Sequence, residues 1–186
     1  KNNVLDKKNV NKTRLLIQNK LKSYKKVKIY SDKNLGLRTR IITGLNKVFK
    51  KETQAIILED DCIPTNEFFI FTQALLKKYK NDKKIASICG SNHLSLWNET
   101  NSDYLVSKYF NSWGWATWRD RWQTANLDTK YLLKKENDKK ILNHLTSYRA
   151  LFYWRYRLKK ILSKKISSWA YTYNYYYFLK KKYHII

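Results

Sequence analysis

The fold expected for this chain depends on residues 55–64, which read Ala-Ile-Ile-Leu-Glu-Asp-Asp-Cys-Ile-Pro. Four apolar residues lead into three carboxylates, and a proline follows shortly after. A short apolar run bounded by a proline turn is typical of a strand buried in a parallel sheet. The carboxylates Glu59, Asp60 and Asp61 then lie at the carboxyl end of that strand, where open α/β sheets bind their ligands.

Three adjacent carboxylates repel one another, so a cation is expected to stabilise them at a half-buried strand end. Carboxylate oxygens suit Mg²⁺ or Mn²⁺, and a divalent ion in turn holds a diphosphate. The alternative is an ordinary solvated acidic turn, because short motifs often occur by chance. The composition weighs against it, since only 14 acids accompany 39 Lys and Arg residues and three of them are adjacent here.

Helix and strand patterns alternate on both sides of this stretch. Apolar residues recur at helical spacing over residues 10–21, 37–50 and 66–79, and Thr65 is expected to cap the last of these helices. Strands are expected at residues 27–30, 85–89 and 104–109, and residues 131–165 are largely helical in pattern. This alternation predicts an α/β fold in which crossover helices flank a mostly parallel sheet.

Four tryptophans occur within residues 113–122, which read Trp-Gly-Trp-Ala-Thr-Trp-Arg-Asp-Arg-Trp. One interpretation is the start of a helix that packs its aromatic side chains into the core. The other is a ligand surface, because Gly114 between two tryptophans suggests a backbone that passes close to another group.

The formal net charge of +25 suggests a polyanionic partner, but the lysines are spread along the chain rather than gathered in one block. Residues 171–178 are strongly aromatic and Lys180-Lys181-Lys182 follow them. A core-facing helix with a solvated basic end is the favoured interpretation of this segment. The alternative is an amphipathic surface segment near anionic lipid.

Three segments resemble the GT-A fold glycosyltransferases, and most closely the bacterial nucleotide-sugar transferases related to the Golgi N-acetylglucosaminyltransferase that starts complex N-glycans. They are residues 58–64 with the following Phe68-Phe69, residues 34–38 (Asn-Leu-Gly-Leu-Arg) and residues 113–118 (Trp-Gly-Trp-Ala-Thr-Trp). The resemblance extends from about Ser31 to the C-terminus. The length of 186 residues suits a single domain over residues 1–186, and the polar residues 1–9 are expected to be flexible.

The resemblance implies a metal-dependent hexosyltransferase that moves a sugar from a nucleotide-diphosphate donor to an acceptor hydroxyl, in surface polysaccharide synthesis. Asp61 is the expected ligand of Mn²⁺ or Mg²⁺. The residues expected to bind the nucleotide-sugar are Asn34, Gly36, Arg38, Glu59, Asp60, Trp113, Gly114 and Trp115.

A general base is also required if the transfer inverts the sugar's configuration. Asp120 ranks first among the aspartates downstream of the acidic stretch, because it lies among the tryptophans. The alternative for Asp120 is a salt bridge to a neighbouring arginine.

The sequence departs from the resembled group in two places. No counterpart of the group's first strand and helix is evident before Val10, which suggests an N-terminally truncated GT-A domain. Relatives often carry an Asp beside the tryptophan that matches Trp169, whereas here the neighbours are Ser168 and Ala170.

The expected partners are the donor and a glycan or lipid-linked acceptor, with no nucleic acid. The expected location is the cytoplasm, with peripheral contact at the inner face of the membrane. Two alternatives stay open: a basic protein that binds nucleic acid or another polyanion, and an inactive truncated transferase-like domain that only binds.

Overall fold

The computed structural model describes residues 4–24, 27–92 and 102–186. These residues form two compact units, residues 1–34 and residues 35–186, and each unit is described by itself.

The first unit consists of the helix α1 (Val4–Lys20) and the segment that follows it. The helix contains the predicted residues 10–21 almost entirely, and it begins earlier, within the region that was expected to be flexible. Arg14 ties it to the following segment by donating a hydrogen bond to the Ser31 carbonyl (3.2 Å) and by lying over the Tyr30 ring. The strand predicted at residues 27–30 is wrong, because this exposed segment pairs with no described strand.

The second unit is built on a five-stranded sheet with the order β1-β4-β2-β5-β3. The strands are β1 (Gln54–Ile57), β2 (Ile85–Cys89), β3 (Val106–Ser107), β4 (Trp115–Trp118) and β5 (Tyr183–Ile185). Only the β2–β5 pair is parallel, while β4 runs antiparallel to both β1 and β2. The α/β class is therefore confirmed, but the prediction of a mostly parallel sheet is wrong.

The strand β4 accounts for this difference. Residues 115–118 were expected to begin a helix or line a ligand, yet they insert between β1 and β2 as a fully buried strand. Their side chains alternate between the two faces of the sheet: Trp115 joins the core on one face, and Ala116 and Trp118 join the core on the other. The two tryptophans and the β-branched Thr117 suit such a pleated, buried surface.

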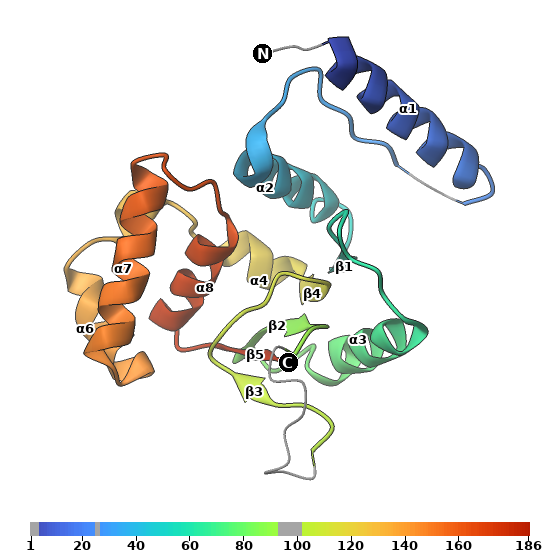
Figure 1. Cartoon of the computed structure of the whole chain (residues 1–186). Coiled ribbons are helices and arrows are strands. Elements are labelled where there is room, and N and C mark those ends of the chain that lie inside the picture. Colours follow the sequence, from blue (N-terminus) through green and yellow to red (C-terminus); the bar gives the residue numbers. More distant parts are fainter. Residues whose placement is uncertain (1–3, 25–26, 93–101) are drawn as a thin grey trace. The chain divides into compact units, whose positions relative to one another are not determined.

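Helices cover both faces of the sheet (Figure 1). The helix α3 (Asn66–Lys78) packs on one face through Leu75 and Leu76. The other face carries α2 (Gly36–Val48), α4 (Arg119–Thr124), α5 (Thr129–Leu132), α6 (Glu136–Leu145), α7 (Tyr148–Leu162) and α8 (Ala170–Leu179). Thr65 precedes α3 as predicted, although its side chain makes no capping hydrogen bond, whereas Ser147 caps α7 by accepting from the Ala150 amide.

The aromatic C-terminal segment is the central helix of this layer. Every residue of α8 from Thr172 to Leu179 is buried, as expected for a helix that is apolar on all sides. Lys180 and Lys181, directly after it, are exposed. The favoured interpretation of this segment, a core helix with a solvated basic end, is confirmed, and α8 is not a surface segment that could meet lipid.

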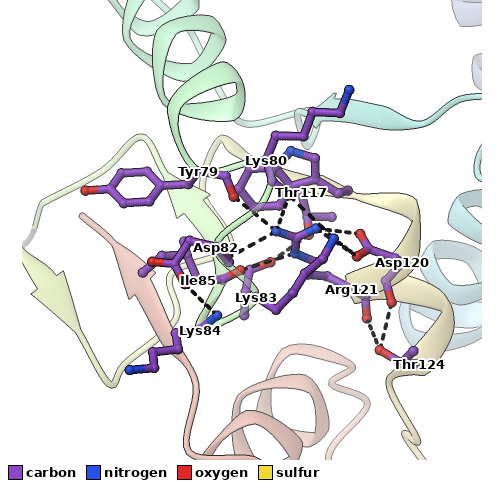
Figure 2. Close-up of polar contacts among 12 residues, drawn as sticks. Tyr79, Lys80, Asp82, Lys83, Lys84, Ile85, Thr117, Asp120, Arg121 and Thr124 are labelled. Atoms are coloured by element: carbon purple, nitrogen blue, oxygen red, sulfur yellow. Dashed lines mark hydrogen bonds and ion pairs between the residues drawn. The ribbon is translucent and has the colours of Figure 1, made fainter.

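Arg121 on α4 holds the loop between α3 and β2 (Figure 2). Its side chain is 1% exposed, and its guanidinium donates to the carbonyls of Tyr79, Lys80, Asp82 and Ile85. It also forms an ion pair with Asp120 (2.7 Å) and lies over the Trp118 ring. One planar cation thus donates to four backbone carbonyls in and beside this loop.

We expect Arg121→Met to lower the free energy of unfolding by about 3 kcal/mol, because the loop carbonyls lose their charged donor. For a chain of this size that corresponds to a fall in Tm of roughly 6–12 °C. Arg149→Met, at an exposed position of α7, is the control and should change stability by no more than about 0.5 kcal/mol. Equal effects of the two substitutions in urea denaturation would contradict this role for Arg121.

His184 on β5 is a fully buried imidazole whose Nδ1 lies 2.7 Å from the Ser87 hydroxyl. Burial, with a smaller contribution from the nearby His144, lowers the pKa of His184 to about 3. The unfolded chain therefore takes up a proton below about pH 6.5 that the folded chain does not.

We expect the free energy of unfolding to fall as pH drops from about 6.5 toward 3, with His184 contributing about 1.4 kcal/mol per pH unit. His184→Phe keeps a ring in the same place and removes this contribution. Urea denaturation between pH 7 and 5 should therefore give a shallower pH dependence for the variant, and parallel curves would show that His184 does not carry it.

Candidate functional site

The three carboxylates lie where the ends of three sheet segments converge. Ile57 at the end of β1 is opposite Trp115 at the start of β4, so residues 58–61 follow β1 past Gly114. The Gly90 amide, directly after β2, donates to the Gly114 carbonyl at 2.7 Å. The segments around Asp61, Gly90 and Gly114 line a cavity of about 260 Å³, together with Phe68.

A larger cavity of about 570 Å³ lies next to the first and shares Ser91 and Trp113 with it. Five aromatic residues line it, with Ser and Asn residues between the rings: Tyr109, Phe110, Trp113, Trp154 and Tyr171, with Asn111, Ser168 and Asn174 among the polar ones. An apolar cavity with a few polar groups is the usual form of a small-molecule site. We call it the aromatic cavity. It adjoins the acidic strand end, which is the end of β1 followed by residues 59–61.

Glu59 is the innermost of the three acids and contacts the indole of Trp169. Partial burial and the negative charges of Asp61 and Asp60 raise the pKa of Glu59, although the hydrogen bond from Trp169 opposes the shift. Within the residues that the structure describes, no Lys or Arg forms an ion pair with any of the three acids. The acids at this strand end thus have no ion-pair partner among the described residues, although the net charge of the chain is +25.

Within the described residues, the acidic strand end does not form a complete metal site by itself. Among the described residues, no three His, Cys, Asp or Glu side chains lie close enough together to hold a metal ion. Mg²⁺ and similar ions are commonly held by one or two carboxylates plus substrate phosphates and water. Of the three acids, Asp61 is the one that lines the smaller cavity.

Arg38, expected to bind the nucleotide-sugar, makes hydrogen bonds within the protein. Its guanidinium donates to the Ser168 carbonyl (3.0 Å), the Thr172 hydroxyl (2.8 Å) and the Leu127 carbonyl (2.6 Å). Burial lowers the pKa of Arg38, and the charge of Asp128 opposes that shift. Arg38 and Glu59 thus both contact the segment around Trp169, and the structure assigns Arg38 to fixing the start of α8.

Asn34 and Gly36 are the other predicted binding residues of the segment 34–38. Gly36 begins α2 with a φ of +70°, a conformation that favours glycine. Asn34 belongs to the first compact unit and Gly36 to the second, so the structure does not test whether they act together.

The tryptophan run divides into core and cavity residues. Trp115 is fully buried, stacks on Trp169 with ring centroids 5.3 Å apart, and belongs to the core. Trp113 is 55% exposed and lines both cavities, while Gly114 has a φ of +63° and lines the smaller one. Trp115 is therefore a core residue, while Trp113 and Gly114 line cavities and stay predicted binding residues.

Asp120 lies apart from the other predicted site residues. Gln54, at the start of β1, is opposite Trp118, so Asp120 lies at the other end of the β1–β4 pair from Glu59. Burial would raise the pKa of Asp120, but hydrogen bonds from Arg121 and Lys83 outweigh it and lower the pKa. A carboxylate paired with two cations is a weak base, and the salt-bridge alternative describes its contacts (Figure 2).

Sequence reasoning missed most of the aromatic cavity. Tyr109, Trp154 and Tyr171 come from three separate segments, and none of them was predicted to bind a ligand. The available signal was the high aromatic content of 16%, which has no positional information.

No family model, curated protein or solved structure matches this chain. In the part of the chain that the structure describes, no helix combines the length and the apolar character needed to cross a membrane.

We expect Trp115→Ala to lower the free energy of unfolding by about 3–5 kcal/mol, because it leaves a cavity among stacked rings. Trp113→Ala should cost no more than about 1 kcal/mol, since its side chain is half exposed. Urea denaturation of both variants tests this division. A Trp113 variant as unstable as the Trp115 variant would place Trp113 in the core as well.

Proposed function

We propose that this protein is a metal-dependent glycosyltransferase of the GT-A type, which moves a sugar from a nucleotide-diphosphate donor to an acceptor hydroxyl. The observation that supports this proposal most is the set of uncompensated carboxylates Glu59, Asp60 and Asp61 beside an aromatic cavity. A nucleoside diphosphate is strongly anionic, so it approaches three carboxylates only when a cation lies between them.

The chain's own residues have separable roles in this proposal. Asp61 holds the divalent ion, and the ion, when bound, offsets the charge that develops on the leaving diphosphate. Glu59 and Asp60 face the ribose or the water around the ion. The sugar extends past Trp113 into the aromatic cavity, where ring faces and amide groups suit its apolar and hydroxyl surfaces.

The acceptor in this proposal is a glycan or a lipid-linked sugar whose hydroxyl enters the aromatic cavity from solvent. The described residues that line this cavity include no carboxylate, and Asp120 lies at the far end of the sheet. This observation favours a second candidate function, in which the domain binds the nucleotide-sugar without transferring it. Release of nucleoside diphosphate in the presence of acceptor distinguishes the two, because only the transferase produces it.

We expect a nucleotide-sugar with Mn²⁺ to raise the Tm of the protein, and a chelator to remove this effect. A ligand at about 100 times its Kd stabilises the folded state by about 2.7 kcal/mol, which is roughly 5–11 °C for a chain of this size. Asp61→Asn should lose the shift, since it removes the charge that holds the ion. Thermal-shift measurements over a panel of nucleotide-sugars provide the test.

Asp82→Asn is the matched control, because Asp82 precedes β2 and so lies at the opposite end of that strand from Gly90. This variant should retain the full shift. An unchanged shift in Asp61→Asn would overturn the assignment of the metal ligand. A salt-sensitive shift with oligonucleotide, and none with any nucleotide-sugar, would favour the polyanion-binding alternative.

A further inference from the structure

The helix α7 has a buried face and a strongly aromatic outer face. Leu151, Trp154, Leu158 and Ile161 point into the core. On the outer side, Tyr148, Phe152 and Tyr156 are 67%, 68% and 54% exposed. Their four-residue spacing aligns them along one side of the helix, so they form a continuous aromatic stripe. Exposed apolar side chains gathered in this way mark an interaction surface.

Positive charge accompanies this stripe. Residues 139–186 contain twelve Lys and Arg residues and no Asp or Glu, so the whole last quarter of the chain lacks acids. Arg149 and Lys159 are exposed on α7, and among the described residues neither pairs with a carboxylate. The Lys160 ammonium lies 5.1 Å from the centre of the Tyr156 ring.

We propose that the outer face of α7 docks the protein on a bilayer that contains anionic lipid. Tyrosine and phenylalanine rings insert at the level of the lipid headgroups, while Arg149 and Lys159 meet the headgroup phosphates. The negative surface potential of such a bilayer adds attraction for each basic residue near it. This docking surface does not depend on the proposed sugar transfer.

The shape of the surface favours a bilayer over a nucleic acid. Proteins that bind single strands combine a positive groove with aromatic platforms, whereas this stripe lies on the convex side of a single helix. A convex helix with aromatic residues on the crest and basic residues beside them matches an interfacial helix. Trp154 on the opposite face lines the aromatic cavity, so docking through α7 brings this cavity close to the headgroups.

The test is co-sedimentation of the full chain with phosphatidylcholine vesicles, with and without phosphatidylglycerol. The native protein should sediment only with the anionic vesicles, and high salt should weaken the binding. The triple variant Tyr148→Ser, Phe152→Ser, Tyr156→Ser should reduce partitioning at least tenfold. The charge variant Arg149→Gln, Lys159→Gln should reduce it by about tenfold or more. Both alter exposed residues, so their circular dichroism and Tm should match the native protein.

A matched control comes from α1, which also exposes apolar residues. The variant Leu15→Ser, Leu16→Ser should leave vesicle binding unchanged. Retained binding in both α7 variants, or its loss in the α1 variant alone, would overturn the proposal. Failure of the native protein to sediment with anionic vesicles would also overturn it. Binding of an oligonucleotide through α7, without binding of vesicles, would overturn the proposal as well.

Discussion

The stack of Trp169 on Trp115 is the contact on which the rest of the second unit depends. Trp169 directly precedes α8, and Trp115 begins the strand that joins β1 to β2, so their stacking fixes the helical layer on the sheet. Trp122 and Tyr173 complete this aromatic cluster around the pair. The indole of Trp169 also hydrogen-bonds Glu59, which connects the core packing directly to the acidic strand end.

This arrangement explains how a strongly basic chain keeps an acidic site intact. The basic side chains lie mainly on exposed positions, while the contacts of Glu59 are with an indole rather than with Lys or Arg. The site therefore retains its negative charge at short range, even though the protein as a whole attracts anions at long range. A cation suits the local negative charge of the three acids, and an anionic ligand suits the positive charge of the whole protein. A cation and an anion bound together therefore suit both, whereas either ion alone suits only one.

The sequence predicted those elements whose pattern is local. The strands β1 and β2 and the helices α2 and α3 follow from apolar periodicity, because each needs only one face or one run to be buried. The strand β4 was missed because residues 115–118 suit either a buried strand or the start of a helix. The prediction of a mostly parallel sheet was wrong for the same reason, because β4 lies between β1 and β2 and makes the sheet mixed.

The site was predictable only in part, for a related reason. The position of Glu59, Asp60 and Asp61 at a strand end follows from the stretch itself, but the place of Asp120 does not. Gly114 and Asp120 are close in the sequence, but the strand β4 between them places them at opposite ends of the β1–β4 pair, with only Gly114 near the acids. The cavity rings come from segments far apart in the sequence, so only the folded chain brings them together.

A crystal structure with Mn²⁺ and a nucleoside diphosphate tests the central claim most directly, because the anomalous signal of manganese locates the ion. The account predicts one peak at bonding distance from an Asp61 carboxylate oxygen, with the diphosphate on its other side and the ribose toward Glu59 and Asp60. A diphosphate bound elsewhere, or an ion at a distance from residues 59–61, would contradict the account.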